Sequence, residues 1–263
     1  MRLDEGRVIE RIHQLHQELE RRPTKWDNSQ LYRKTRKFFG TWNNAMEKAG
    51  YKVKRNQFPD IPDKLTPELS YFLGILVTDG NMYANTKRGY YSIQLFNSYE
   101  DETEMLLQLI QFLFSYKSFV RKRKLGFNKR ISNEIHINSK KLIYQLKEKF
   151  NIPTGAKSKT LRLPKIMFNT TKENMYNFIR GVIDGDGTIS KYKIIRIASG
   201  SPKFLEDMKH LLKILDIETK DIRYERTAYV LPFRVKSTLE LSKQMYSNTK
   251  FYYPRKRAKF EKQ

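Results

Sequence analysis

The sequence predicts an α+β fold in which one helix–strand–strand–helix–strand–strand–helix unit is used twice, behind a small all-α module at the N-terminus. Two observations carry this prediction. An apolar helical stretch that ends in a glycine-flanked aspartate occurs at residues 72–80 and again at residues 179–187. After each copy, segments with strand alternation and segments with helical periodicity follow in the same order. Such an order favours antiparallel sheets with one face on helices and one face open.

The N-terminal 55 residues have the pattern of three short helices. Residues 4–21 carry an apolar stripe at helical spacing, residues 29–38 form a second helix, and Thr41 can cap a third over residues 42–49. So small a module buries little apolar surface, and we expect its aromatic residues Trp26, Phe39 and Trp42 to anchor its core. Residues 56–64 contain Pro59 and Pro62 and are typical of a linker.

From residue 65 onward the two repeats can be followed element by element. In the first repeat, residues 65–165, we expect a strand over 90–97, a helix over 104–114, a hairpin of 119–124 with 131–138, and a helix over 140–150. In the second repeat, residues 166–263, we expect strands within 188–199, a helix over 202–215, strands within 222–235 and a helix over 238–246.

The charge of the chain points to a polyanionic partner. Lys and Arg total 52 against 28 Asp and Glu, which gives a formal charge of +24 over 263 residues. Nucleic acid is the usual partner of such a surface, because neutralising its phosphates releases condensed cations. A surface that only serves solubility is the alternative, although acidic residues serve that purpose better.

Composition excludes several other classes. Without cysteine the chain has no disulfide scaffold and no cysteine-based zinc finger, and its four histidines are scattered. No apolar run approaches the length of a membrane span, and the first residues lack the apolar core of a signal peptide. We therefore expect a soluble intracellular protein.

The two apolar helices carry small residues at a spacing that allows close packing. Gly74 and Thr78 are four positions apart, as are Gly181 and Gly185, and small side chains on one face let two helix backbones approach each other. Packed in this way, the helices would place Asp79 and Asp186 side by side at their C-termini.

Two carboxylates at the negative ends of two helix dipoles repel each other unless cations are present. Oxygen ligands alone, from Asp79, Asp186 and carbonyl groups at Thr78 and Gly185, suit Mg²⁺ or another divalent cation such as Mn²⁺. Such metal ions can activate water and stabilise the leaving oxygen in phosphodiester cleavage. An Asp-Gly turn is common on its own, so the prediction depends on the duplication.

These nine-residue stretches resemble the LAGLIDADG motif, and residues 65–260 are similar to a single-chain, two-repeat LAGLIDADG homing endonuclease. The resemblance implies saddle-shaped sheets, motif helices at the interface of pseudo-symmetric halves, and metal binding by Asp79 and Asp186. Val77 and Arg180 depart from the motif, at positions other than the metal-binding one.

The same resemblance implies a lysine near each site, after the last helix of each repeat. Lys157 and Lys256 occupy these places, although a basic cluster such as residues 255–257 also suits phosphate contacts. It further implies a polar residue at the end of the second strand that positions water, here Asn97 and Ser199. Capping of the helices that follow is an equal alternative for these two.

Residues 23–50 contain the series Phe-Phe-Gly-Thr-Trp-Asn-Asn-Ala and resemble the helical repeat that accompanies many homing endonucleases. The resemblance implies a small helix-turn-helix-like DNA-binding module. Basic residues crowd its second helix, namely Arg33, Lys34, Arg36 and Lys37. A helical trimer that merely covers the main domain is the alternative.

An antiparallel sheet with one open face can lie in the major groove of DNA. The strands of the first repeat and their turns offer Lys87, Arg88, Gln94, Arg121, Arg123, Lys129 and Arg130. Those of the second offer Lys191, Lys193, Arg196, Arg223 and Arg226, and Arg255 and Arg257 follow near the C-terminus. Alternation would turn Ile93, Leu95, Ile195 and Ile197 toward the helices. Because the two repeats differ in sequence, we expect an asymmetric target.

The sequence therefore predicts a monomeric homing endonuclease that makes a metal-dependent double-strand break at a long asymmetric site in double-stranded DNA. The alternative is a protein of the same fold that acts as an intron RNA maturase or a DNA-binding regulator without cleavage. A purely structural basic protein would explain the charge but not the duplicated aspartate. Since the chain lacks the terminal residues of a splicing domain, we expect an intron-encoded or freestanding protein.

Overall fold

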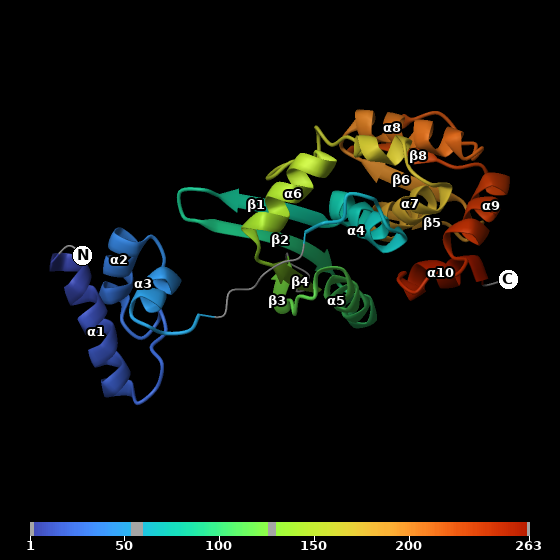
Figure 1. Ribbon diagram of the computed structural model, residues 1–263. Coiled ribbons are helices and arrows are strands. Elements are labelled where there is room, and N and C mark those ends of the chain that lie inside the picture. Colours follow the sequence, from blue (N-terminus) through green and yellow to red (C-terminus); the bar gives the residue numbers. More distant parts are fainter. Residues whose placement is uncertain (1–2, 54–59, 126–129, 262–263) are drawn as a thin grey trace. The chain divides into compact units, whose positions relative to one another are not determined.

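The computed structural model describes residues 3–53, 60–125 and 130–261, and it divides the chain into two compact units, residues 1–57 and 58–263 (Figure 1). The predicted linker over residues 56–64 lies partly outside the described residues, which resume at Asp60. Among the helices of the described ranges, none combines the length and apolar character needed to cross a membrane.

The first unit consists of three helices that enclose their own small core. Its elements are α1 (Leu3–Leu19), α2 (Ser29–Phe39) and α3 (Trp42–Lys48). Asn28 and Thr41 cap α2 and α3 by accepting hydrogen bonds from Leu31 N and Asn44 N, so polar side chains satisfy the orphan amides of each first turn. The core is formed by Val8, Ile12, Leu15, Leu31, Trp42, Ala45, Met46 and Ala49.

One predicted core residue of this unit is wrong. Trp26 is 78% exposed, whereas Trp42 is buried and Phe39 packs half-buried against the core. Trp26 lies in the loop between α1 and α2, and Lys25 Nζ sits 4.7 Å from its ring centroid. Helical periodicity does not extend over a loop, so no pattern in the sequence indicates whether this side chain points inward or outward.

The second unit contains the two predicted repeats. The first lobe consists of α4 (Pro67–Thr78), β1 (Gly80–Asn85), β2 (Tyr90–Asn97), α5 (Glu100–Phe114), β3 (Phe119–Leu125), β4 (Arg130–Ile137) and α6 (Lys140–Phe150). The second lobe consists of α7 (Lys172–Asp186), β5 (Gly187–Ile189), β6 (Ile195–Ser199), α8 (Pro202–Ile214), β7 (Arg223–Glu225), β8 (Ala228–Pro232) and α9 (Val235–Met245). The α+β class and the doubled order of elements are thereby confirmed.

Three details differ from the sequence prediction. Helix α5 begins at Glu100, four residues before the predicted start, because three acidic residues favour its first turn. A short 3₁₀ helix, η1 (Lys165–Phe168), precedes α7. The chain also forms a last helix, α10 (Pro254–Glu261), where the polar composition had indicated only a basic cluster.

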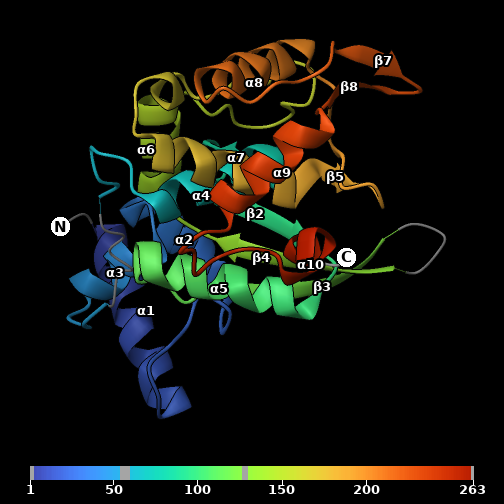
Figure 2. The same cartoon turned by 90° about the vertical axis from the view of Figure 1, so that its right-hand side faces the viewer.

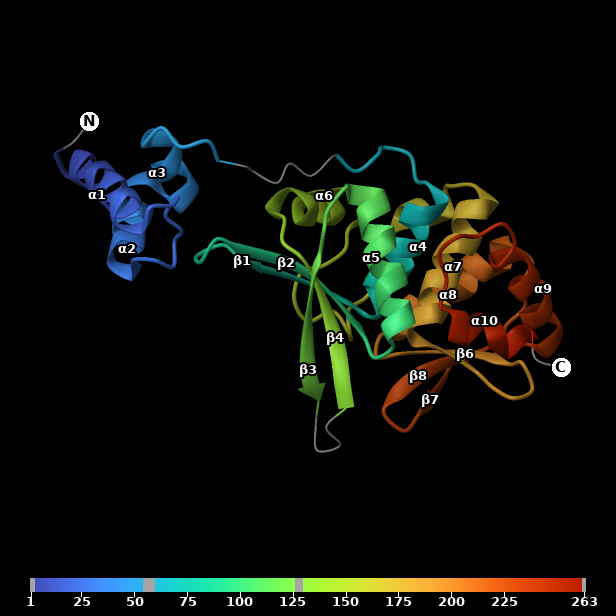
Figure 3. The same ribbon diagram turned by 90° about the horizontal axis from the view of Figure 1, so that it is seen from below.

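Both sheets are four-stranded and antiparallel, with the orders β1-β2-β4-β3 and β5-β6-β8-β7. Ile93, Leu95, Ile195 and Ile197 are fully buried in the core of the unit, as the alternation predicted. In each lobe helices pack against the central strands (Figures 2 and 3), while the other face carries polar and charged side chains such as Arg121. The alternating pattern thus decides which face of each sheet is left for a partner.

Helices α4 and α7 lie side by side in the middle of this unit (Figures 1 and 3) and make its most extensive contact between helices. A Cβ placed on Gly74 would lie 2.4 Å from Phe178 O, and one on Gly181 would lie 2.3 Å from Tyr71 O. No larger side chain fits there without separating the helices. The small residues therefore bring the two backbones into direct contact and unite the lobes.

Candidate active site at the seam between the lobes

The close packing of α4 and α7 brings the ends of both helices to one place. Asp79 caps the C-terminus of α4, and Asp186 is the last residue of α7. Thr78 occupies the space that a side chain at position 185 would need. A Cβ added to Gly185 would lie 2.1 Å from Thr78 Oγ1 and 3.3 Å from Asp79 Oδ2. The two carboxylates thus come from elements more than a hundred residues apart and share one site.

The electrostatics of the site match this arrangement. Burial, together with the negative charge of Asp186, raises the pKa of Asp79 to about 7 against the opposing effect of Lys256 and Lys157. Asp186 retains exposed surface, yet the protein atoms around its carboxyl partly exclude water and also raise its pKa. Both shifts indicate a site that holds two negative charges poorly on its own.

Two lysines occupy equivalent places in the two lobes. Lys157 donates from Nζ to Leu76 O, and Lys256 donates from Nζ to Ile183 O at 3.2 Å and to Gly187 O. Leu76 and Ile183 each lie three residues before the aspartate of their helix. The lysines therefore bind matching carbonyls in the last turn of each motif helix, where the helix dipole favours a cation.

Burial lowers the pKa of Lys157 to about 8, although Asp186 and Asp79 oppose the shift. Burial also lowers the pKa of Lys256, and the neighbouring Arg255 adds to this effect. Lys157 lies in the loop after α6, as predicted, and Gly155 N anchors this loop by donating to Met82 O at 2.8 Å. Lys256 lies after α9, as predicted, in the first turn of α10.

The polar residues at the ends of the second strands also match each other. Asn97 Oδ1 accepts a hydrogen bond from Tyr99 N at 2.7 Å, and Ser199 Oγ accepts one from Ser201 N at 3.1 Å. In both lobes the bond spans two residues and turns the chain into the next helix. Neither residue caps the helix that follows, because the N-caps are Tyr99, which makes no side-chain cap bond, and Ser201, whose own hydroxyl accepts from Phe204 N. The role of Asn97 and Ser199 in positioning water stays a prediction.

A hollow of about 450 Å³ opens beside Asp186. Its wall contains side chains of both lobes, with Thr78, Asn81 and Lys157 from the first and Asp186 and Ser199 from the second. It is the place where a phosphate group could approach the carboxylates.

The chemistry of this donor set fits a hard divalent cation. Among the described residues, no group of three or more His, Cys, Asp and Glu side chains gathers at one place, so a metal here would rely on two carboxylates and on carbonyl or water oxygens. The Thr78 hydroxyl is engaged within its own helix, where it donates to Gly74 O and Ile75 O. The raised pKa values of both aspartates indicate that two ionised carboxylates are unfavourable here, and a bound cation would stabilise them.

Three residues near the site were missed from the sequence. Asp184 is buried and accepts hydrogen bonds from Tyr71 OH at 2.9 Å, Tyr246 OH at 3.1 Å and Tyr253 N at 3.0 Å. This carboxyl stands in the second motif where the first has Val77, and its position in Asp-Gly-Asp-Gly was the available signal.

The other two residues that the sequence analysis missed are Tyr253 and Glu102. Burial raises the pKa of the Tyr253 hydroxyl well above its usual value, and the nearby Asp79 charge adds to the rise. Glu102 is completely buried and pairs with Arg255 of the second lobe. In the sequence Glu102 looked like one of several acidic residues in a first helical turn, so no local signal could have found it.

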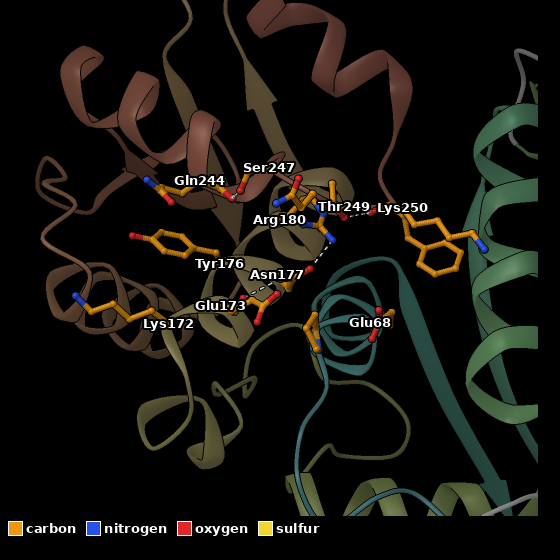
Figure 4. A pocket seen from close by; sticks show the side chains of 13 residues that line it. Glu68, Lys172, Glu173, Tyr176, Asn177, Arg180, Gln244, Ser247, Thr249 and Lys250 are labelled. Atoms are coloured by element: carbon orange, nitrogen blue, oxygen red, sulfur yellow. Dashed lines mark hydrogen bonds between the residues drawn. The ribbon is translucent and has the colours of Figure 1, made fainter.

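Arg180, the second departure from the motif, lies near the middle of α7. It is 2% exposed, with its guanidinium 4.7 Å from the Tyr71 ring centroid, and it donates to Met245 O and to Asn177 Oδ1. Figure 4 shows it beside a hollow of about 520 Å³ at the N-terminal ends of α4 and α7. Arg180 therefore braces α7 against the end of α9 within the second lobe.

The predicted DNA-contacting residues are in part free and in part engaged. Exposed members are Arg33, Lys34, Arg36 and Lys37 on α2, Lys87 and Arg88 in the β1–β2 turn, Arg121 and Arg123 on β3, Lys191 after β5 and Arg226 after β7. Gln94 is half-buried and accepts a hydrogen bond from Asn81. Lys129 lies outside the described residues, and Arg130 begins β4.

Several of the arginines already have acidic partners within the protein. Arg196 on β6 pairs with Glu225 across β8, and Arg223 pairs with Glu225 along the same strand, β7. Arg123 pairs with Glu134 at 3.2 Å. Further engaged side chains are Lys193 with Phe260 O, Arg255 with Glu102 and Arg257 with Glu261.

Comparison with known protein families agrees with both resemblances. Residues 173–242 match the model of a LAGLIDADG-like domain, and residues 3–52 match that of a homing endonuclease associated repeat. The first match covers α7 through most of α9, and the second covers α1 to α3.

Solved structures share the fold of the second unit. The homing endonuclease I-DmoI, in complex with DNA and Ca, gives a TM-score of 0.57 at 20% identity over 73% of this chain and 96% of that chain. The homing endonuclease I-WcaI, bound to its DNA recognition sequence, gives 0.59 at 12% identity over 81% and 96%. At these identities the likeness establishes the fold alone.

Curated relatives match over a small part of their own length. A probable translation initiation factor IF-2 of Thermococcus kodakarensis is 35% identical over 106 residues, which are 39% of this chain and 9% of the relative. The DNA-directed RNA polymerase subunit Rpo1C of Methanocaldococcus jannaschii is 24% identical over 84% of this chain and 23% of its own length. The chain thus spans less than a quarter of either relative, and the roles in their names are not assigned to it. The chain contains a homing endonuclease associated repeat and a LAGLIDADG-like domain, and its fold is that of the LAGLIDADG homing endonucleases.

Proposed function

We propose that this protein is a site-specific homing endonuclease that makes a metal-dependent double-strand break at a long asymmetric DNA target. One observation carries the proposal. Asp79 and Asp186, from the two copies of one motif, lie at a shared seam, and Lys157 and Lys256 bind matching carbonyls beside them. One aspartate and one lysine from each lobe suit one cut in each of the two antiparallel DNA strands.

Asp79 and Asp186, with carbonyl oxygens at Thr78 and Gly185, are the residues that would hold a divalent cation. When bound, the cation would neutralise the phosphodiester charge and increase the acidity of water. Lys157, with a pKa of about 8, can exchange a proton near neutral pH or stabilise the charge that develops on phosphate oxygens. Asn97 and Ser199 would orient water at the margin of the site.

The remaining surface suits a long duplex. Exposed arginines and lysines stand on the open faces of both sheets and on α2, and the formal charge of +24 favours phosphate contacts. The lobes differ at most of these positions, which supports an asymmetric target. Since one chain supplies both aspartates, we propose that it acts as a monomer. The DNA complexes of I-DmoI with Mn and with Ca support the use of a divalent cation.

Substitution of the two aspartates tests the proposal. Asp79→Asn and Asp186→Asn are each expected to reduce Mg²⁺-dependent cleavage at least a thousandfold, while the affinity for DNA stays within a few fold. Substrate is found by digesting a randomised duplex library with the wild-type protein and sequencing the ends.

The outcomes separate the possible functions. Loss of DNA binding or of the folded state in both variants would assign the aspartates a structural role. A wild-type protein that binds a specific duplex or an intron RNA, yet cuts no member of the library, would support the regulator or maturase alternative.

A further inference from the structure

A buried carboxylate joins the two lobes next to the Asp79 half of the site. Glu102, in the first turn of α5, is 0% exposed and accepts a hydrogen bond from Asn97 Nδ2 at 3.0 Å. It also accepts bonds from Arg255 Nε at 3.1 Å and Nη2 at 3.5 Å. A buried charge is tolerated only with such partners. Here one partner comes from each lobe, and Glu102 and Arg255 are 153 positions apart in the chain.

Each partner of Glu102 has a second contact that limits its freedom. Asn97 accepts a bond from Tyr99 N through Oδ1, so its amide group has a single orientation with Nδ2 toward Glu102. The guanidinium of Arg255 also lies 4.3 Å from the Tyr99 ring centroid. Arg255 directly precedes Lys256 in α10, which lies beside α5 (Figure 2). The pair therefore ties the helix that carries Lys256 to the strand end that carries Asn97.

The other half of the site is connected differently. The loop that carries Lys157 is tied to α8 by the exposed Arg162, which pairs with Asp207 at 2.7 Å. Glu102 follows Asn97 by five positions, and the residue five positions after Ser199 is Phe204. Phe204 is buried and apolar, and its backbone N–H donates to Ser201 Oγ. The two lobes agree in their aspartates, lysines and strand-end turns but differ at this position.

We propose that Glu102 is a positioning residue that serves one half of the active site. By holding Asn97 and Arg255 together across the lobe boundary, it keeps the Asn97 amide and the Lys256 ammonium in place relative to Asp79. Charge-assisted bonds of this kind give both strength and a defined geometry. Loss of the Glu102 charge consequently slows the cleavage of one DNA strand more than that of the other. This inference rests on the proposed nuclease function.

The test compares Glu102→Gln with Glu104→Gln, a matched change at an exposed position of the same helix. Single-turnover cleavage is followed on duplexes labelled at one strand or the other. Glu102→Gln is expected to slow one strand about tenfold relative to the other, so that nicked duplex accumulates, with the DNA affinity changed less than about threefold. Glu104→Gln is expected to keep the wild-type ratio of strand rates.

Arg255→Gln, alone and combined with Glu102→Gln, supplies a second measurement. Because both residues act through one contact, the double variant is expected to show the strand bias of the single variants and no more. Urea unfolding of the metal-free proteins gives a readout without activity, in which the two substitutions should be non-additive as well.

Each failure has its own signature. Equal slowing of both strands in step with a fall in stability would overturn the positioning role and make Glu102 a general structural residue. A wild-type strand ratio in Glu102→Gln would overturn it too. A wild-type protein that cuts neither strand would instead overturn the proposed nuclease function, and this inference with it.

Discussion

Of the two aspartates predicted to bind metal, Asp79 has the more strongly raised pKa. Burial and the charge of Asp186 raise its pKa to about 7, whereas an unfolded chain would have a value of about 3.9. Between about pH 4 and pH 7, Asp79 therefore keeps a proton in the folded protein that it loses in the unfolded chain. A divalent cation would have to displace this proton, so metal binding and pH are linked.

The linkage predicts how cleavage responds to pH. The rate is expected to rise as pH increases through about 7, and the midpoint should move to lower pH at higher Mg²⁺ concentration, because the ion competes with the proton on Asp79. Single-turnover rates at two Mg²⁺ concentrations would measure this. A midpoint that is independent of Mg²⁺ would contradict it.

The same pKa predicts the stability of the metal-free protein. Since the folded pKa lies above the unfolded one, the Asp79 contribution favours the folded state at low pH and is lost as pH rises from about 4 to about 7. Urea unfolding should show a smaller decline over this window in Asp79→Asn than in the wild type. Identical pH profiles for the two proteins would show that Asp79 titrates normally.

Among the secondary-structure elements, the pair α4 and α7 determines whether a site forms at all. Gly74 and Gly181 face each other with no room for a Cβ, and the motif aspartates meet only because the backbones touch there. The sheets depend on the same contact, since each follows directly from the end of one of these helices. Packing at two glycines thus controls the geometry of the proposed active site.

Gly181→Ala is expected to destabilise the second unit by about 1–3 kcal/mol, because the added methyl group would lie 2.3 Å from Tyr71 O. Cleavage should fall further than stability, since the helices must separate and carry the aspartates apart. Urea unfolding and cleavage rates would be compared with Lys172→Ala, at an exposed position of α7. Unchanged stability in Gly181→Ala would show that the seam can adjust at no cost.

The open faces of the sheets predict a second element-level result. Arg121 on β3 and Lys87 in the β1–β2 turn are exposed, so Arg121→Ala and Lys87→Ala should each weaken DNA binding and lower the salt dependence by roughly one charge. Lys213→Ala, at an exposed position of α8 among the helices, is the control. Equal effects at all three positions would indicate that DNA does not distinguish the faces.

At the scale of the whole molecule, the chain consists of two units with separate cores. The helical trimer buries its own apolar residues around Ile12 and Met46, and the second unit buries a larger set around α4 and α7. Each core is complete without the other, so each unit can be examined alone. This separation allows the DNA recognition proposed for the first unit to be tested apart from the cleavage proposed for the second.

Deletion of residues 1–57 is expected to leave a folded second unit that still cuts DNA, but with lower affinity and a shorter protected footprint. The reason is the loss of the four exposed basic residues of α2. Footprinting and binding titrations would measure the change. A footprint of unchanged length would remove the DNA-binding role proposed for the helical trimer.

Sequence alone was sufficient for the features that repeat with a short period. Strand alternation placed Ile93 and Ile195 in the core, helical spacing outlined most helices, and the glycine strips predicted the contact of α4 with α7. The duplicated motif identified Asp79 and Asp186 as a pair. These features were readable because each depends on residues only a few positions apart, and the duplication repeats the same local pattern.

Only the tertiary structure decided which other groups surround the aspartates. Glu102 meets Arg255, Tyr253 meets Asp184, and Arg196 meets Glu225 through contacts between segments far apart in the chain. Local composition cannot distinguish such a buried carboxylate from a solvated one, because burial is a property of the folded path. The sequence therefore determined that two halves build one site. Only the packing of those halves determined that Glu102 and Arg255 join the lobes on one side, where the other side has the apolar Phe204.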